Sequence, residues 1–128
     1  EEFHPICAGY GVDLISMVAP TSEKRIAKIA REAEGFLYVV SSLGVTGMRS
    51  EITTDLTSIV ATIRENTRIP CAVGFGISTP QQAAAMAEYA DGVIVGSAIV
   101  NIMEKYGKNA PQYVGDYVKE MKKALSVY

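Results

Sequence analysis

The chain has 128 residues, 48% of them hydrophobic, and a formal net charge of −2, which is typical of one globular domain with a hydrophobic core. Because charges are mixed along the chain and apolar runs are short, a nucleic-acid surface and membrane-spanning helices of about 20 residues are disfavoured. The length is about half of the ~250 residues that a complete (β/α)8 barrel needs.

Residues 1–9 predict the end of a helix, and no initiator Met or signal-like segment precedes them. We therefore expect the chain to begin inside a longer protein. Cys7 and Cys71 form no CxxC pair and no Cys/His cluster. This arrangement argues against structural zinc and predicts two small, reduced core residues, as in a cytoplasmic protein.

Strand and helix patterns then alternate along the chain. A mostly apolar run over 12–19 predicts a first strand, closed by Pro20, after which Thr21 or Ser22 can cap a helix that ends at Gly35. This helix has an apolar face at helical spacing, made of Ile26, Ile29, Ala30 and Ala33. A second strand is predicted over 36–40.

The second half repeats this alternation. After a polar stretch to Thr54, a helix presents Leu56, Ile59, Val60 and Ile63 on one face. A third strand over 71–73 precedes a strong helix start, with Thr79 as N-cap, Pro in the first turn and Gln three residues after the cap. A fourth strand over 92–95 leads into a short helix ending near Gly107. A last helix from about residue 110 is expected to bury Tyr113, Val114, Tyr117, Val118, Met121 and Leu125.

Apolar strands that alternate with amphipathic helices predict a parallel sheet covered by helices. Glycine-rich segments recur after each later strand, whereas a doubly wound sheet concentrates its ligand chemistry at one switch point. We therefore expect an α/β fold in which residues 1–128 form half of a single (β/α)8 barrel, with about four parallel strands.

Three glycine-bearing segments, 44–47, 74–78 and 96–100, each follow a strand and precede a helix. Glycine lets backbone N–H groups approach a ligand closely, and a helix N-terminus favours an anion. Ser97 can add a hydroxyl donor and is expected to cap its helix. No Lys or Arg lies within these segments, so they predict a neutral cradle for a phosphate group. Each segment alone could be an ordinary tight turn.

Specific stretches carry a family resemblance: 38–47 (YVVSSLGVTG), 73–78 (VGFGIS), 91–100 (DGVIVGSAIV) and, upstream, 12–21 (VDLISMVAPT). Together they resemble the C-terminal half of the tryptophan synthase alpha subunit, and the likeness extends in order and spacing over essentially the whole chain. The resemblance implies strands five to eight of a barrel that cleaves indole-3-glycerol phosphate to indole and glyceraldehyde 3-phosphate.

The resemblance also implies roles for individual residues. The substrate phosphate would be bound by Gly47, Gly76, Gly96 and Ser97, and the indole pocket would include Tyr38, Thr46 and Phe75. Thr46 would belong to a mobile loop, about 47–56, that communicates with a beta subunit carrying pyridoxal phosphate. The alpha subunit would need no cofactor or metal of its own, and the two subunits would form an alpha2-beta2 complex in the cytoplasm.

The family's catalytic groups are a Glu on its second strand and an Asp in the following loop, and both would lie upstream of residue 1. No catalytic residue is therefore expected in this segment, which would be inactive alone. Glu51 and Asp55 are weak substitutes on the mobile loop, and His4 is expected to have a surface or packing role.

Two alternatives stay open at this point. One is a different phosphate-binding barrel enzyme, related to indole-glycerol-phosphate synthase or ribulose-phosphate epimerase, and the other is a non-catalytic half-barrel that binds phosphate or serves in assembly. Apart from the resemblance, Tyr38 and Phe75 could equally be packing residues.

A half-barrel also leaves two unpaired strand edges, so we expect the isolated chain to self-associate or to need its missing half. Sedimentation of the chain as a stable, folded monomer would contradict this expectation.

Overall fold

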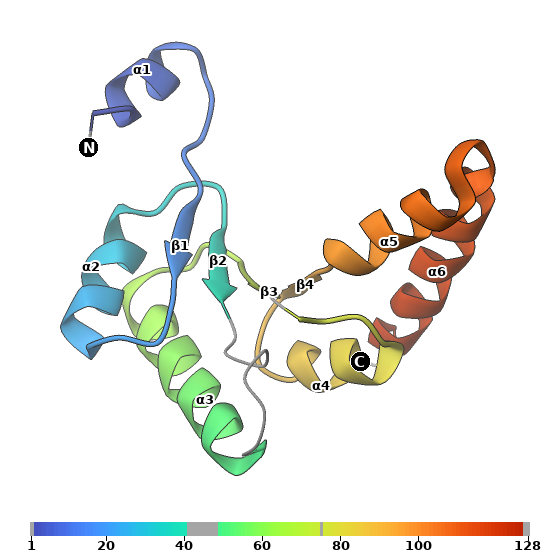
Figure 1. Cartoon of the computed structure of the whole chain (residues 1–128). Coiled ribbons are helices and arrows are strands. Elements are labelled where there is room, and N and C mark those ends of the chain that lie inside the picture. Colours follow the sequence, from blue (N-terminus) through green and yellow to red (C-terminus); the bar gives the residue numbers. More distant parts are fainter. Residues whose placement is uncertain (1, 41–48, 75, 127–128) are drawn as a thin grey trace.

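A computed structural model of the chain describes residues 2–40, 49–74 and 76–126 (Figure 1). Strands and helices alternate along it, as the sequence pattern predicts. In chain order they are α1 (His4–Gly9), β1 (Ser16–Val18), α2 (Glu23–Glu32), β2 (Leu37–Val40), α3 (Arg49–Asn66), β3 (Cys71–Gly74), α4 (Pro80–Ala87), β4 (Gly92–Ile94), α5 (Ser97–Tyr106), the 3-10 turn η1 (Gly107–Asn109) and α6 (Ala110–Leu125).

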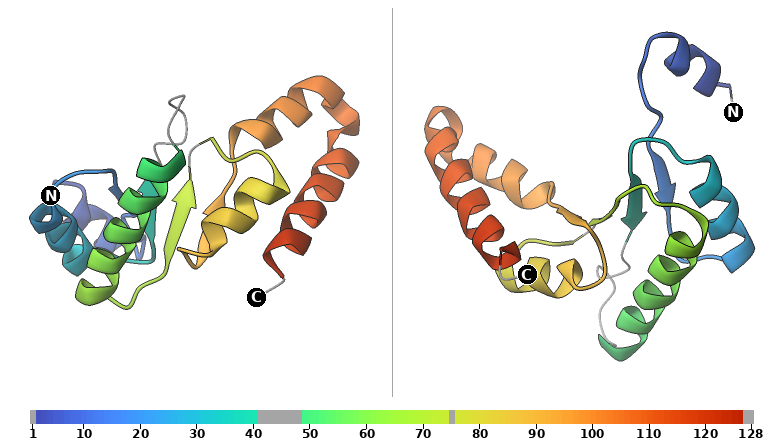
Figure 2. Two further views of the ribbon diagram at one scale, coloured as in Figure 1. Left: turned by 90° about the horizontal axis from the view of Figure 1, so that it is seen from below. Right: turned by 180° about the vertical axis from the view of Figure 1, so that it is seen from behind.

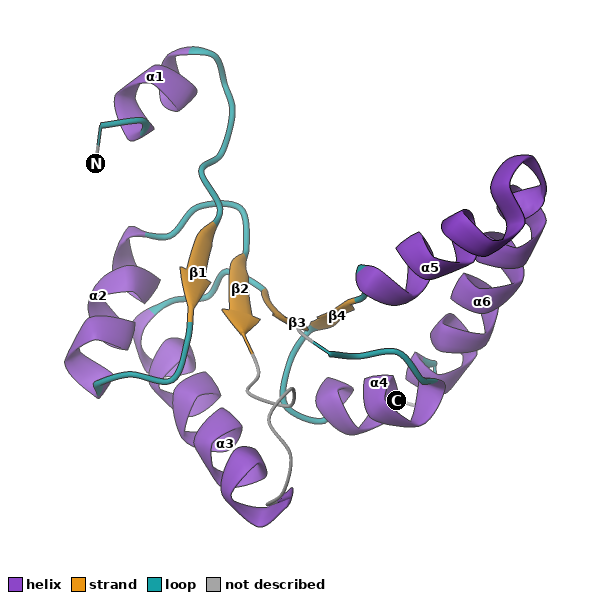
Figure 3. Cartoon of the chain, viewed as in Figure 1, coloured by secondary structure: helices purple, strands orange, loops and turns teal. Residues whose placement is uncertain are grey.

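The four strands form one sheet in the order β1-β2-β3-β4, and every neighbouring pair is parallel. Figure 3 shows these strands between two groups of helices, with α2 and α3 beside β1 and β2, and α4 to α6 beyond β4. Parallel neighbours in sequence order, joined by helical crossovers, are the arrangement of consecutive strands in a barrel wall.

One face of the sheet makes the hydrophobic core. Val18, Val39 and Val73 are register partners and are fully buried, together with Leu37 and Cys71. The alternate positions on the opposite face are more open: Met17 is 60% exposed, and Tyr38 and Ala72 are half-buried. Because side chains alternate along a strand, the helices cover the first face and leave the second one accessible.

Two element boundaries differ from the sequence expectation. The first strand begins at Ser16 rather than at residue 12, because its partner β2 begins at Leu37, which pairs with Ser16. Val12 and Leu14 therefore have no ladder partner and are exposed. The helix expected after Thr54 already begins at Arg49.

The last helix buries a narrower stripe than its apolar residues predict. It packs against α4 and α5, and both views of Figure 2 show α5 and α6 side by side. Met121 is buried, whereas the expectation was wrong for Tyr113, which is 45% exposed and stacks on Tyr106 with 3.6 Å between ring centroids. Val118 is also exposed, because it lines an open hollow with Ala83, Val93 and Ile99 rather than a packed contact.

Helix α1 lies apart from the other helices in Figure 1 and buries none of its residues, so Cys7 is only half-buried rather than part of the core. His4 is exposed, and its Nε2 lies 2.9 Å from Glu34 Oε1. In the part of the chain that the structure describes, no helix has the length and apolar character to cross a membrane.

At the amino end of the sheet, Asp91 joins β3, β4 and α3. Its Oδ2 accepts hydrogen bonds from the Cys71 N–H at 2.8 Å and from Arg64 Nη2 at 2.5 Å. Burial acts to raise the pKa of the Asp91 carboxyl, but the Cys71 N–H and the Arg64 guanidinium outweigh it and hold this pKa below its usual value. Burial in turn raises the pKa of the Cys71 thiol, which favours the neutral form expected of a core residue.

Replacing Asp91 with Asn should therefore destabilise the chain in a pH-dependent way. A carboxyl whose pKa is lowered by folding contributes stability above its unfolded pKa of about 3.9 and loses it as the pH falls through the folded value. Urea unfolding of both proteins at neutral pH and near pH 3 measures this. The stability difference should be largest at neutral pH and shrink in acid; a difference that does not change with pH would contradict this account of Asp91.

Candidate functional site

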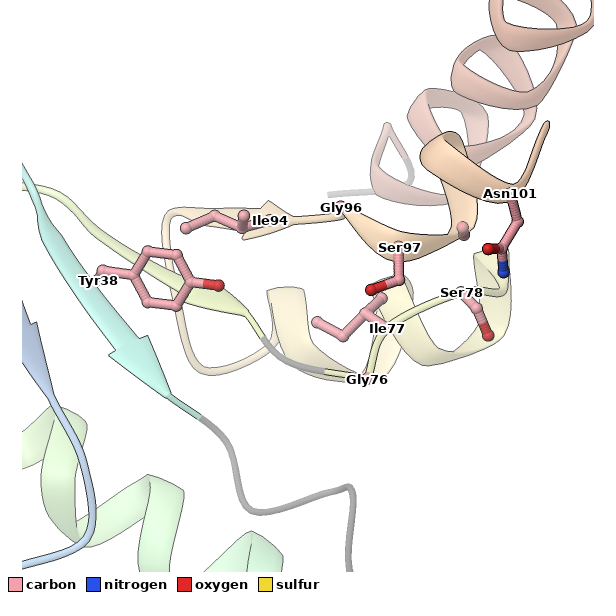
Figure 4. Close-up of a pocket in the computed structure, with 9 residues that line it drawn as sticks. Tyr38, Gly76, Ile77, Ser78, Ile94, Gly96, Ser97 and Asn101 are labelled. Carbon is pink, nitrogen blue, oxygen red and sulfur yellow. The ribbon is translucent and has the colours of Figure 1, made fainter. Parts of the chain in front are cut away.

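A cavity of about 470 Å³ opens where the carboxyl ends of β3 and β4 meet the start of α5 (Figure 4). The residues that line it come from four places in the sequence: β2, the loop after β3, the end of β4, and α5 with its cap. They are Tyr38, Gly76, Ile77, Ser78, Ile94, Gly96, Ser97, Ala98 and Asn101. The carboxyl ends of the strands are where barrel enzymes bind their ligands.

One wall of the cavity is the uncapped start of α5. Gly96 occupies the N-cap position and has no side chain, so α5 has no side-chain cap. The expectation that Ser97 caps this helix was wrong, because Ser97 is already its first helical residue. The Gly96 carbonyl accepts from the N–H groups of Ile99 and Val100, whereas the helix offers no acceptor to the N–H groups of Ser97 and Ala98.

The helix start on the opposite wall is closed by its own side chains. Thr79 Oγ1 accepts from the Gln82 N–H at 3.2 Å, and Gln82 Oε1 accepts from the Thr79 N–H at 3.1 Å, which completes the predicted capping box. Gln82 Oε1 also accepts from the N–H of Ser78 at 2.9 Å. Of these two helix starts, only that of α5 therefore leaves its first amides without a side-chain cap.

Tyr38 forms the side of the cavity next to β2. Its ring lies against the backbone of Gly74, where an added Cβ would be 2.6 Å from the Tyr38 Cζ and 2.9 Å from Cε1. Glycine at position 74 is therefore needed for the close approach of the ring, and Figure 4 shows the phenol oxygen directed toward the cavity. On the next loop, Gly76 has φ = 72°, a conformation that glycine adopts with little strain.

The described lining contains no charged side chain. Its polar groups are the hydroxyls of Tyr38, Ser78 and Ser97, the amide of Asn101, and backbone N–H groups. A helix of ten residues places partial positive charge at its N-terminus, which favours an anion by about 0.3–1 kcal/mol. The cavity therefore has an uncharged lining, and the N-terminus of α5 favours negative charge at one side of it.

Of the residues expected to bind substrate, Tyr38, Gly76, Gly96 and Ser97 come together around this cavity. Gly47, Thr46 and Phe75 lie outside the described residues. Reasoning from the sequence missed other residues of the lining, namely Ile77, Ser78, Ile94, Ala98 and Asn101. Asn101 follows Ser97 by four positions, which places both on one helix face, so helical spacing could have found it.

The fold and the cavity define half of a (β/α)8 barrel with a polar, ligand-sized site at the carboxyl ends of its strands. The chain belongs to the tryptophan synthase alpha chain family, whose sequence pattern matches residues 1–126. This membership replaces the alternative of an indole-glycerol-phosphate synthase or ribulose-phosphate epimerase relative.

Individual proteins agree with this assignment. The tryptophan synthase alpha chain of Lactiplantibacillus plantarum is 54% identical over 125 residues, which cover 97% of this chain and 47% of that protein. The tryptophan synthase subunit alpha of Campylobacter jejuni superposes with a TM-score of 0.77 at 34% identity, over 99% of this chain and 48% of that one.

A third similar protein comes from a structure of the tryptophan synthase a2b2 complex of Pyrococcus furiosus. It has a TM-score of 0.79 at 33% identity and covers 96% of this chain and 50% of that one. The α/β half-barrel predicted from the sequence is thereby confirmed. The chain spans about half the length of the relatives that it matches.

Proposed function

We propose that this chain is the substrate phosphate-binding half of a tryptophan synthase alpha chain, a lyase of tryptophan biosynthesis. The complete enzyme would cleave indole-3-glycerol phosphate to indole and glyceraldehyde 3-phosphate. The observation that carries the proposal is the cavity, where Gly76 and the uncapped start of α5 face each other. Residues 1–128 would form strands five to eight of one barrel domain.

The cavity fits a phosphate monoester in its donors and in its charge. The N–H groups of Ser97 and Ala98 need an acceptor, and the Ser97 hydroxyl lines the same space. Hydrogen bonds to a charged group contribute about 1.5–3 kcal/mol each, so a few of these donors suffice to orient a substrate through its phosphate. Gly47 and the backbone of Gly76 and Gly96 would complete this cradle.

The rest of the substrate would lie toward β2. Tyr38 offers an aromatic face beside Ile94 in the same cavity, which suits the flat, apolar indole ring. Thr46 and Phe75 would contribute to this pocket from the neighbouring loops. The phosphate would thus lie at the start of α5 and the indole ring beside Tyr38 and Ile94, so that the two ends of indole-3-glycerol phosphate contact different parts of the lining.

The proton transfers of the cleavage would be made outside this segment. A retro-aldol step needs an acid for the indole carbon and a base for the glycerol hydroxyl, and the described cavity contains no carboxylate. We propose that the Glu and Asp of the family, on the other half of the barrel, supply them. The segment binds and orients substrate and needs no cofactor or metal.

The family also supports a partner. The Pyrococcus furiosus relative is described as part of an a2b2 complex with mutual activation, so we propose a beta subunit, carrying pyridoxal phosphate, as the partner of the complete enzyme. Both cysteines are free, in keeping with a reducing, cytoplasmic location.

Among the described strands, β1 and β4 each have one neighbour, which supports self-association of the isolated chain through these edges.

Titration of the 128-residue chain with an indole glycerol phosphate analogue and, separately, with inorganic phosphate tests the proposal. Both compounds should bind, and the analogue should bind more tightly because it also contacts Tyr38. Equal affinity for both would favour the alternative, a non-catalytic phosphate-binding half-barrel. Binding of neither would contradict the assignment of the cavity.

A further inference from the structure

Ser78 lies in the cavity wall formed by the loop after β3, and each of its polar groups is held from outside the cavity. Its N–H and its hydroxyl both donate to Gln82 Oε1, at 2.9 and 3.2 Å. Its carbonyl oxygen accepts a hydrogen bond from the hydroxyl of Tyr117 at 2.7 Å. The first two bonds are local, within α4 and its entry, whereas the third spans 39 residues.

The bond from Tyr117 links the two walls of the cavity. One wall is the loop that carries Gly76 and Ser78, and the other is the start of α5 with Ser97. Tyr117 belongs to α6, which packs along α5 and also against α4. Helix α6 therefore connects the two walls, through its packing on α5 and its hydrogen bond to Ser78, in addition to the pairing of β3 with β4 beneath them.

The side chain of Tyr117 suits this role. It is half-buried and packs against the hydrophobic core, which fixes its ring. A phenol is protonated and can donate at neutral pH, and burial raises the pKa of this one further. The hydroxyl is aimed at a backbone carbonyl, an acceptor that a substitution at Ser78 cannot remove.

We propose that Tyr117 is a positioning residue for the ligand site: its hydrogen bond to the Ser78 carbonyl holds the loop after β3 at the distance from α5 that an anionic ligand requires. The inference rests on the proposed function, because it assumes that the cavity binds a phosphate group. It extends that function to a residue that lines no part of the cavity.

The test compares Tyr117→Phe with Tyr113→Phe in the 128-residue chain. Both changes remove one hydroxyl from α6 and keep the ring, but Tyr113 is stacked on Tyr106 away from the cavity. Affinity for inorganic phosphate is measured by calorimetry, and stability by urea unfolding. Loss of one positioning hydrogen bond should weaken binding about 3- to 10-fold in Tyr117→Phe, with Tyr113→Phe binding as the unchanged chain does.

The outcomes separate this inference from the function on which it rests. If the unchanged chain binds phosphate and Tyr117→Phe binds equally well, Tyr117 has no positioning role. A lower urea midpoint with unaltered affinity would show a structural role alone and would also overturn the proposal, as would an equal loss in Tyr113→Phe. If the unchanged chain unfolds cooperatively in urea and yet binds neither phosphate nor the indole glycerol phosphate analogue, the proposed function itself fails.

Discussion

Replacing Ser97 with Asp is expected to weaken phosphate binding by about 10- to 150-fold, which corresponds to losing one charge-assisted hydrogen bond of about 1.5–3 kcal/mol. The new carboxylate would stand at the first residue of α5, beside the two amides that have no acceptor within the helix. It would satisfy them itself and repel a dianion. Calorimetric titration with inorganic phosphate measures the loss.

Ser22→Asp provides the matched control for this change. Ser22 also stands at the start of a helix, as the N-cap of α2, and its side chain makes no capping bond. It does not line the cavity, so the same added charge should leave phosphate affinity within about twofold, because exposed distant charges are screened. Equal losses in both variants would mean that net charge, rather than the start of α5, governs binding.

Replacing Leu37 with Ala should cost about 2–5 kcal/mol of unfolding free energy, the range measured when a buried leucine is truncated. Leu37 is fully buried on β2 and belongs to the core cluster. Since whole domains are stable by only about 5–15 kcal/mol, the variant should show a strongly reduced urea midpoint or no cooperative transition.

Leu14→Ala removes the same atoms from a site that is 41% exposed and lies before the first strand. Its unfolding free energy should change by about 0.5 kcal/mol or less, as is usual for surface positions. A cost at Leu14 as large as that at Leu37 would show that the segment before β1 is buried in solution, for example by pairing of two chains.

Local signals in the sequence were sufficient to predict the order of the strands and helices and the helix start at Thr79. The Thr, Pro and Gln pattern predicts a capping box that the structure contains, because both partners lie within one turn. The glycine pattern likewise predicted that Gly76, Gly96 and Ser97 would converge, since parallel strands deliver their carboxyl ends to one edge.

The details that sequence reasoning missed or placed wrongly concern helix ends and contacts between elements, which a local sequence pattern does not determine. Apolar spacing could not tell that Tyr113 would face outward, because the packing of α6 decides which part of its apolar face is covered. Ser97 was expected to cap α5, but Gly96 occupies that position, a shift of one residue within the usual uncertainty of helix ends. The hydrogen bond between Tyr117 and Ser78 joins residues far apart in the chain and required the fold.

The missing cap on α5 also has a thermodynamic consequence. The first amides of this helix have no acceptor within it, so an anion that supplies one would act as a part of the folded protein. Ligand that binds only the native state adds stability as its concentration rises above the dissociation constant, reaching about 2.7 kcal/mol at a hundredfold excess. The concentration of a bound anion would then influence how long the folded polypeptide persists.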